Sequence, residues 1–495
     1  MFLMKYYTIM EAKMISLRNY QQSAVAAIRQ AYANKKRAPL LVLPTGGGKT
    51  TIFAYVTQQA SLKNNCVFLL CHRAELVKQI SMTLAKFDVC HQVIAPPVIM
   101  TQCRNAHYLE FGKAFIAPSK VYVCSVQTLI KRLSTMPTPD LIVCDEAHHL
   151  TPDSTWGKII QSYPQARVLP VTATPCRLDG KGLKNICDDM IISETMENLI
   201  KQGYLCNYRA FCPPNTLDLS TVKKTAGDYN KGQLAEAMDK PTITGDAVKH
   251  YLKLCNGKRA VAFCVSVAHA KHVAESFNLV GVPSESLDGT LSPEERDARI
   301  KRFERGETLV LTSCDVISEG FDLPAIEAAI LLRPTQSLSL YLQQVGRALR
   351  TFSGKKEAII LDHVGALSRH GLPDMDREWT LDGVSKKERQ KNDEPDINIT
   401  TCKQCFAVFL ANKTQCPYCK WIKPIPKGRE IEQTEGELTE FDKEQYKLKL
   451  KLETRAARDY DSLVALGRQR GYKSPEFWAR KQLEIREAYR AKSRN

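Results

Sequence analysis

A glycine-rich stretch, LPTGGGKT at residues 43–50, follows an apolar run of strand length and precedes a helical pattern. Glycines let backbone N–H groups turn inward around phosphate groups, and the helix start adds the positive end of its dipole. In this context Lys49 neutralises the β- and γ-phosphates of a nucleotide, and Thr50 holds Mg²⁺. The strict loop pattern has glycine where this chain has Leu43, so a glycine-rich turn without a ligand is the alternative. The predicted phosphate-binding residues are Thr45, Gly46, Gly47, Gly48, Lys49 and Thr50.

Two adjacent carboxylates, Asp145 and Glu146, come directly after another apolar run, at residues 141–144. In open parallel sheets, ligand chemistry takes place beyond the carboxyl ends of the strands. This position suits Asp145 for binding Mg²⁺ through its water shell, and Glu146 for orienting and deprotonating an attacking water. A solvated acidic turn is the alternative.

A third set of chemical groups lies far along the chain, in the pattern Q-x-x-G-R-x-x-R at residues 343–350. Arg347 and Arg350 are three positions apart, so on a helix both point the same way. Arginines aimed at a γ-phosphate can stabilise the charge that develops during phosphoryl transfer. Gln343 would help to place the water. The alternative is an exposed basic helix face.

Two series of strand-length apolar runs surround these groups, and each series alternates with helical patterns. This alternation is typical of parallel α/β architecture. The first series comprises residues 40–43, 66–70, 121–123, 141–144 and 168–171, and the second comprises 260–263, 309–311, 328–332 and 358–361. The fold class is therefore α/β, with two parallel sheets in tandem.

The predicted organisation has six parts. Residues 1–13 form a leader in which the start codon is open, because Met14 is an alternative start. The first nucleotide-binding domain spans 14–200 and the second spans 201–370, with a hinge near 190–215. They are followed by a linker at 371–398, a cysteine module at 399–425 and a basic helical tail at 426–495.

Composition restricts the class of protein. The chain has 495 residues and a formal net charge of +17, which favours a polyanionic partner. Its 17 cysteines, without a secretion signal, indicate reduced thiols and a cytoplasmic protein. No run approaches the ~18 apolar residues of a membrane-spanning helix, so no membrane partner is expected.

Four cysteines near the C-terminus form two C-x-x-C pairs: Cys402, Cys405, Cys416 and Cys419. Such pairs suit a tetrahedral Zn²⁺ site. Redox-active cysteines and a metal-free module are the alternatives. The tail that follows mixes basic residues with aromatic ones, a composition that suits nucleic-acid contact and equally a helix packed on the rest of the protein.

From residue 17 to residue 362, the series of motifs resembles the superfamily 2 helicases of DEAH type, with D-E-A-H at residues 145–148. The resemblance implies two RecA-like domains that hydrolyse ATP between them. It makes Gln21 the adenine contact, with Tyr20 or Arg18 stacking nearby. His148, Thr172 and Thr174 would couple the ATP state to nucleic-acid binding.

The same resemblance implies further contacts. Gly320 and Asp322 would lie near the ribose of the nucleotide. The residues near the bound strand would be Arg73, Gln79, Ser125, Gln127 and Thr128 in the first domain, and Asp288, Gly289, Thr290 and Thr312 in the second.

The last motif lacks the G-R-A-G-R and H-R-x-G-R forms typical of RNA helicases, which favours DNA. Residues 332–341 and the cysteine module are similar to RadD-like and prophage-encoded DNA helicases. The resemblance therefore implies a bacterial or phage DNA helicase for replication, recombination or repair, acting on single-stranded or forked DNA. The alternatives are a duplex DNA translocase or remodeller, an RNA helicase, and a nucleotide-gated DNA-binding adaptor. A protein partner of the C-terminal module also stays open.

Overall fold

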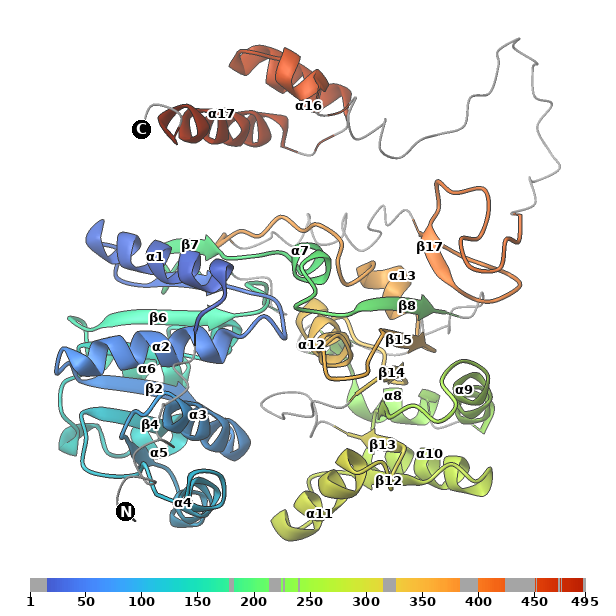
Figure 1. Cartoon of the computed structure of the whole chain (residues 1–495), viewed down its shortest axis with the longest axis horizontal. Helices are drawn as coiled ribbons and strands as arrows, with labels where there is room; N and C mark the ends of the chain where they lie inside the picture. Colours follow the sequence, from blue (N-terminus) through green and yellow to red (C-terminus); the bar gives the residue numbers. More distant parts are fainter. Residues whose placement is uncertain are drawn as a thin grey trace, which may run out of the picture. The chain divides into compact units, whose positions relative to one another are not determined.

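The computed structural model of this chain divides into two compact units, residues 1–423 and 424–495 (Figure 1). It describes residues 16–177, 182–212, 224–225, 228–238, 241–314, 326–382, 399–422, 450, 452–470, 472 and 474–492. Predicted residues Gly320 and Asp322, and residues 1–13 of the leader, lie outside this part of the chain.

The first sheet has seven strands in the order β3-β4-β2-β5-β6-β1-β7, all paired in parallel. Its strands are β1 (Pro39–Val42), β2 (Val67–Cys71), β3 (Gln92–Ile94), β4 (Val121–Ser125), β5 (Leu141–Cys144), β6 (Arg167–Thr172) and β7 (Asp189–Ile192). Neighbouring residues point to opposite faces, so Leu40 and Leu41 enter two different buried clusters. Burial on both faces explains why these strands are continuous apolar runs.

Helices connect these strands and cover both faces of the sheet (Figure 1). They are α1 (Asn19–Ala33), α2 (Lys49–Leu62), α3 (Ala74–Lys86), α4 (Pro97–Phe111), α5 (Val126–Leu129), α6 (Thr155–Ser162) and α7 (Met196–Lys201), with short 3₁₀ turns at Leu133–Thr135 and Ala147–His149.

The second sheet has six strands in the order β12-β13-β11-β14-β15-β8, again all in parallel. Its strands are β8 (Asn207–Phe211), β11 (Ala260–Phe263), β12 (Ser284–Leu287), β13 (Val310–Ser313), β14 (Ala328–Leu331) and β15 (Glu357–Asp362). Its helices are α8 (Lys231–Met238), α9 (Pro241–Leu254), α10 (Val267–Leu279), α11 (Pro293–Glu304), α12 (Leu338–Ala348) and α13 (Ala366–His370). A short antiparallel pair, β9 (Lys224–Thr225) and β10 (Asp228–Tyr229), precedes α8.

The prediction of two tandem parallel sheets with flanking helices is confirmed. The two strand orders also correspond place by place, since β3-β4-β2-β5-β6-β1 matches β12-β13-β11-β14-β15-β8. Strand β1, which leads into the glycine-rich loop, therefore has β8 as its counterpart.

The chain after the second sheet returns to the first domain, a contact that the sequence did not predict. The carbonyl oxygen of Leu381 accepts hydrogen bonds from the backbone N–H groups of Leu183 (2.9 Å) and Lys184 (3.1 Å). Lys184 also forms an ion pair with Asp382 at 2.9 Å. The first part of the predicted linker, residues 371–382, thus joins the two domains, while residues 383–398 lie outside the described part.

Residues 399–422 form a small module with an antiparallel pair, β16 (Ile399–Thr401) and β17 (Val408–Leu410). It packs against the outer strand β8 (Figure 1). Ala407 pairs with Phe211 in an antiparallel bridge, and the N–H of Cys212 donates to the carbonyl oxygen of Phe406 at 2.9 Å.

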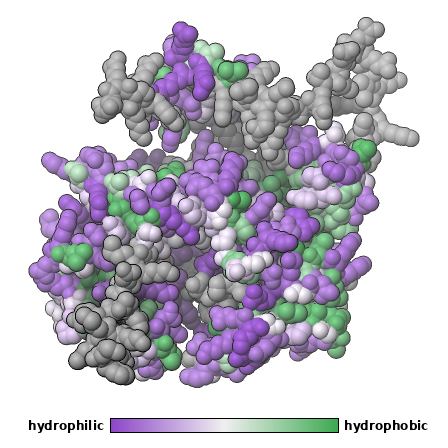
Figure 2. All heavy atoms as spheres, in the orientation of Figure 1, coloured by the Kyte–Doolittle hydropathy of each residue, from purple (hydrophilic) through white to green (hydrophobic). Residues whose placement is uncertain are grey.

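The second unit contains two packed helices, α16 (Tyr460–Gln469) and α17 (Pro475–Lys492). Leu463, Val464 and Ala479 are buried between them. Among the described residues, no helix is long and apolar enough to cross a membrane. Figure 2 shows mostly hydrophilic side chains on the described part of one face, with hydrophobic ones in separate patches.

Candidate functional site

The glycine-rich loop has the backbone shape that its sequence predicts. Gly46 and Gly48 both have φ of +85°, a left-handed conformation that glycine adopts without strain, and Gly48 caps the start of α2. A Cβ atom at Gly48 would lie only 2.5 Å from Nε2 of Gln21, so a larger residue would clash. The loop therefore requires glycine at this position, and helix α2 begins directly after it with Lys49 and Thr50.

Lys49 lies partly buried, with Nζ 3.4 Å from the carbonyl oxygen of Leu43. Burial lowers the pKa of Lys49, whereas the nearby carboxylates of Glu146 and Asp145 raise it. For Asp145 the effect of burial has the opposite sign, because burial raises the pKa of a carboxyl group. The charge of Glu146 raises this pKa further, and the charge of Lys49 lowers it. Lys49, at the start of α2, and the two carboxylates that follow β5 are thus close enough to influence one another's charge.

Helix α12 of the second domain lies against this loop. A Cβ atom at Gly346 would be 2.7 Å from Cβ of Thr45, and one at Gly46 would be 3.5 Å from Cγ of Arg350. Gln343 and Arg347 are buried, and both Arg347 and Arg350 act electrostatically on Lys49. The structure thus brings the predicted groups of both domains together: Lys49, Asp145, Glu146, Arg347 and Arg350.

A chain of polar contacts leads from Glu146 into the second domain. Nδ1 of His148 lies 3.3 Å from Oε2 of Glu146 and 3.4 Å from Oγ1 of Thr172. The Thr172 hydroxyl donates to the carbonyl oxygen of Thr174 at 3.0 Å. The Thr174 hydroxyl in turn donates to the hydroxyl of Ser339 on α12 at 2.6 Å. Ser339 was not predicted as a site residue, although it lies one helical turn before Gln343.

The predicted adenine segment contacts the glycine-rich loop directly. The carbonyl oxygen of Gly47 accepts from the Tyr20 hydroxyl at 2.7 Å and from Nε2 of Gln21 at 3.3 Å. The guanidinium of Arg18 lies over the ring of Tyr204, 4.3 Å from its centroid. Tyr204 was not predicted as a site residue, because it lies in the connection between the domains and not in a motif.

Four residues predicted to meet a nucleic-acid strand lie at the carboxyl ends of β2 and β4 or just beyond. Arg73 precedes the first residue of α3, and the Ser125 hydroxyl donates to Oε1 of Gln127 at 2.9 Å. Nε2 of Gln127 donates to the carbonyl oxygen of His72 at 3.4 Å. Thr128 lies in α5, whereas Gln79 lies more than one turn into α3.

In the second domain, Gly289 and Thr290 are exposed beyond β12, and buried Asp288 accepts from the N–H of Thr290 at 2.8 Å. Thr312 differs from the expectation. It is fully buried in β13, and its hydroxyl donates to the carbonyl oxygen of Ala270 at 2.6 Å. The structure therefore does not bring Thr312 to the surface that the other residues share.

Two ion pairs near this surface join the domains. Arg296 on α11 lies 2.7 Å from Glu75 on α3, and Lys78 lies 4.0 Å from Asp297. Because α3 follows Arg73 and α11 follows Thr290, the pairs connect the two helices behind the candidate strand-binding residues. These ion pairs were not predicted from the sequence, since charges on helix faces are common.

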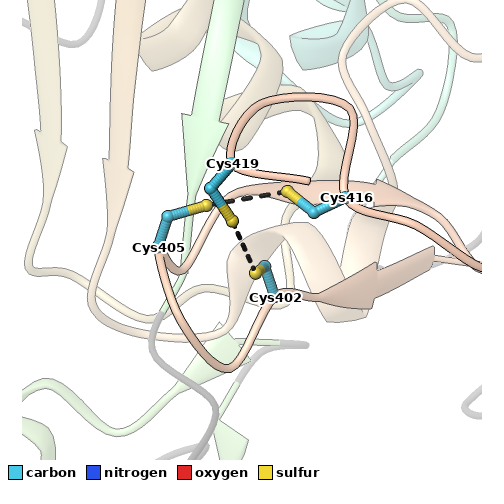
Figure 3. Close-up of side chains that lie close together, drawn as sticks. All are labelled: Cys402, Cys405, Cys416 and Cys419. Atoms are coloured by element: carbon cyan, nitrogen blue, oxygen red, sulfur yellow. Dashed lines mark hydrogen bonds between the residues drawn. The ribbon is translucent and has the colours of Figure 1, made fainter. Parts of the chain in front are cut away.

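The four cysteines of the C-terminal module converge, and their Sγ atoms all lie within 4.8 Å of one another (Figure 3). The two C-x-x-C loops have matching geometry. Phe406 and Lys420 both follow the second cysteine of a pair and have φ near +60°, at +61° and +63°. Their N–H groups donate to the carbonyl oxygens of Cys402 (3.0 Å) and Cys416 (3.1 Å).

This donor set fits Zn²⁺, which takes four thiolates in a tetrahedron. Phe406 and Lys420 hold a left-handed conformation that costs roughly 1–2 kcal/mol for a residue with a side chain. A bound ion offsets such a cost, because metal binding contributes to the folding free energy.

Comparisons with known proteins agree with this geometry. Residues 14–177 match the family described as type III restriction enzyme, res subunit, and residues 245–352 match the helicase conserved C-terminal domain. A 51.5 kDa protein of a Lactococcus phage is 34% identical over 418 residues, covering 84% of this chain and 85% of the phage protein.

A Saccharomyces cerevisiae protein named as an ATP-dependent helicase, IRC3, is 32% identical over 374 residues. The match covers 71% of this chain but only 52% of the yeast protein, so this chain corresponds to about half of that relative. A fragment of an HsdR subunit of a type I restriction enzyme from Vibrio vulnificus has a TM-score of 0.56 at 20% identity, covering 72% of this chain and 66% of that fragment.

The solved structure shows the same fold of two RecA-like domains, which confirms that part of the prediction. The DEAH subtype and the similarity to RadD stay predictions. Proteins of this class are ATP-hydrolysing enzymes that use Mg²⁺ and bind nucleic acid. With both motor domains matched in order along the chain, this protein belongs to the superfamily 2 helicases.

Proposed function

We propose that this chain is an ATP-driven DNA motor that couples hydrolysis to movement along a strand. One observation carries the proposal: α12 of the second domain packs on the glycine-rich loop of the first, with Gly346 against Thr45. Arg347 and Arg350, at the end of this helix and just beyond it, are close enough to act electrostatically on Lys49 of the loop, which supports a role for them at the phosphates. An ATP site shared between two domains changes when they open or close.

The roles of the individual groups follow from their positions. Lys49 and the amides of the loop hold the phosphates of ATP, and Gln21 and Arg18 lie at the adenine end. Mg²⁺ neutralises phosphate charge, and Thr50 and Asp145 would hold it. Glu146 accepts the proton of the attacking water.

Arg347 and Arg350 stabilise the charge that grows on the transferred phosphate, and Gln343 orients the water. His148 contacts both Glu146 and Thr172, so it couples the presence or absence of the γ-phosphate to the contacts of Thr172.

Hydrolysis alters the hold on DNA through contacts that cross between the domains. The Thr174–Ser339 hydrogen bond links the end of β6 to α12 on the ATP side. The Glu75–Arg296 ion pair links α3 to α11 behind Arg73 and Thr290. If the domains separate after phosphate release, both links loosen and the spacing between the two strand-binding surfaces changes.

DNA is favoured over RNA by the form of the last motif, and a net charge of +17 suits either polyanion. A role in replication, recombination or repair and a cytoplasmic location stay predictions. A second candidate is a duplex DNA translocase that never separates strands, which the match to restriction-enzyme subunits favours.

We also propose that Cys402, Cys405, Cys416 and Cys419 hold one structural Zn²⁺. Because the module packs on β8, the ion would stabilise the outer edge of the second domain as well as the module itself. A protein partner of this module stays a prediction.

The direct test is the ATP hydrolysis rate of the full chain without nucleic acid and with single-stranded DNA, duplex DNA, forked DNA and RNA of matched length. We expect stimulation by DNA and none above background in Lys49→Ala. Stimulation by RNA alone would replace the DNA proposal with an RNA helicase, and no hydrolysis under any condition would reject the motor. Strand separation on forked DNA then distinguishes a helicase from a duplex translocase.

A further inference from the structure

The last turn of α12 carries Arg347, and Arg350 follows two residues after the helix ends at Ala348. A lysine further along the chain, Lys355, holds this end of the helix. The ammonium group of Lys355 donates to the carbonyl oxygen of Arg350 at 2.8 Å and to that of Ala348. It also donates to the carbonyl oxygen of Ile326, just before β14, at 2.8 Å. An ammonium group has three N–H donors, which matches these three carbonyl acceptors, and the Cys206 side chain is a further hydrogen-bond partner of Lys355.

These contacts complete a helix end. The last carbonyl groups of a helix have no partner within it and carry the negative end of the helix dipole. Lys355 meets both needs at Ala348, the last residue of α12, because it brings an N–H donor and a positive charge there, and it also binds the carbonyl oxygen of Arg350 just beyond the helix. The Lys355 side chain is partly buried, and burial lowers the pKa of Lys355, so keeping the ammonium group charged there costs free energy.

The other side of the same turn is held by the connection between the domains. The N–H of Cys206 donates to the carbonyl oxygen of Leu349 at 2.9 Å, and Leu205 pairs with Arg350 in an antiparallel bridge. The backbone of residues 348–350 is therefore fixed between the interdomain connection and Lys355. The position of this backbone decides how far Arg347 and Arg350 reach toward Lys49.

We propose that Lys355 is a positioning residue for the two arginines, and this inference rests on the proposed ATP-hydrolysing function. Lys355 touches neither the nucleotide nor the reacting atoms. It acts by holding the helix end from which the arginines extend, so its loss lowers the turnover number and leaves ATP binding by the first domain nearly unchanged.

The test compares Lys355→Met, Lys355→Gln and Lys355→Arg in the full chain, with Lys356→Met as the matched control because the Lys356 side chain is exposed. For each variant, kcat and KM for ATP are measured at saturating DNA, beside the melting temperature. A displacement of about 1 Å in a catalytic group can reduce the rate about 100-fold. We therefore expect kcat of Lys355→Met to fall 10- to 100-fold.

Lys355→Gln, which keeps an N–H donor but not the charge, should fall between Lys355→Met and the parent, and Lys355→Arg should recover part of the loss. KM should stay nearly constant, and Lys356→Met should match the parent throughout. If Lys355→Met does not fold, Lys355→Gln decides the outcome.

A folded Lys355→Met or Lys355→Gln variant with parental kcat would overturn the inference, as would a kcat loss in Lys356→Met of the same size. A rise in KM equal to the fall in kcat would make Lys355 a general structural residue instead. Failure of the proposed function is a different result, because the parent itself would then hydrolyse no ATP.

Discussion

Strands β1 and β8 occupy equivalent places in two sheets of matching order, but the chain leaves them in different ways. After β1 it forms the glycine-rich loop and begins α2 at Lys49. After β8 the N–H of Cys212 donates to Phe406, and Ala407 of the cysteine module pairs with Phe211. One strand end leads into a phosphate loop, and the other is covered by protein.

A second pair of equivalent strands repeats the contrast. At the end of β6, the Thr172 and Thr174 hydroxyls continue a path from Glu146 to α12. At the end of β15, buried Asp362 accepts from the N–H groups of Val364 (3.0 Å) and Leu367 (2.7 Å) in its own loop. The Asp362 carboxylate therefore stabilises the backbone of the loop that follows β15. Equivalent strand ends therefore make different contacts in the two domains, because the loops that follow them differ.

The largest effect expected from this comparison comes from substituting, in turn, a residue that follows β1 and a residue that follows β8. Lys49→Ala should reduce ATP turnover by about 10³-fold, since it removes charge stabilisation from the phosphates. Cys212→Ala, at the matching strand end of the second domain, should leave turnover close to the parental rate. Steady-state hydrolysis with DNA measures both, and equal losses in the two variants would contradict the assignment of the phosphate site.

A smaller effect is expected where the two domains meet through hydroxyl groups. Thr174→Val and Ser339→Ala each remove one side of a 2.6 Å hydrogen bond. Loss of such a bond costs about 1 kcal/mol, and we expect DNA stimulation of hydrolysis to fall several-fold. The double variant should lose little more than either single variant. Additive losses would show that the two residues act separately.

The cysteine module at residues 399–422, which packs on β8, should affect stability and have much less effect on ATP hydrolysis. We expect one Zn²⁺ per chain by elemental analysis, and loss of the ion in Cys416→Ser. Without it, amide hydrogen exchange should rise in β17 and at the end of β8, because the Phe406–Cys212 contact depends on the module. Unchanged exchange in a zinc-free protein would make the module independent of the metal.

The last expected effect concerns stability and not hydrolysis, and it is a pH dependence shared by the two domains. Burial lowers the pKa of His91 to about 4 in the first domain, and those of His363 and His370 to about 3 and about 4 in the second. An unfolded histidine titrates near 6.5. As the pH falls from about 6.5 to 4, the unfolded chain binds protons that the folded chain does not, so the free energy of unfolding decreases.

His91 alone should contribute about 3 kcal/mol over this window. Its Nε2 lies 2.7 Å from the Ser81 hydroxyl, which also lies 3.1 Å from Nε2 of His107. The free energy of unfolding is measured with urea at several values between pH 4 and pH 7. We expect it to change less steeply with pH in His91→Gln than in the parent, and similarly in His370→Gln. If both variants kept the parental pH dependence of the unfolding free energy, burial of these histidines would not be its cause.

Much of this architecture could be predicted from sequence, because buried parallel strands are short apolar runs. The predicted runs at 141–144 and 260–263 coincide with β5 and β11. Strands β3, β7, β8 and β12 were missed, because their residues are partly exposed or polar. Residues 66–70 were predicted one position early, since Cys71 is buried as the last residue of β2.

The sequence singles out residues where a motif carries the chemistry, as for Lys49, Asp145 and Arg347, and their catalytic roles stay predictions. Ser339, Tyr204 and Lys355 were missed because their significance depends on contacts made after folding. The bonds of Lys355 to Ile326 and Ala348, for example, follow from the turn between α12 and β15 and from no local pattern. Thr312 stands at a motif position whose side chain is buried in β13, and its contact with a nucleic-acid strand stays a prediction.

The most direct test of the central claim, that the second domain completes an ATP site held by the first, is made on Arg347→Ala. Its ATP dissociation constant and its turnover at saturating ATP and DNA are measured side by side. We predict that turnover falls about 10³-fold while the dissociation constant changes little, because the arginine acts mainly on charge that develops in the transition state. Parental turnover in this variant, or an equal loss of affinity and turnover, would contradict the account.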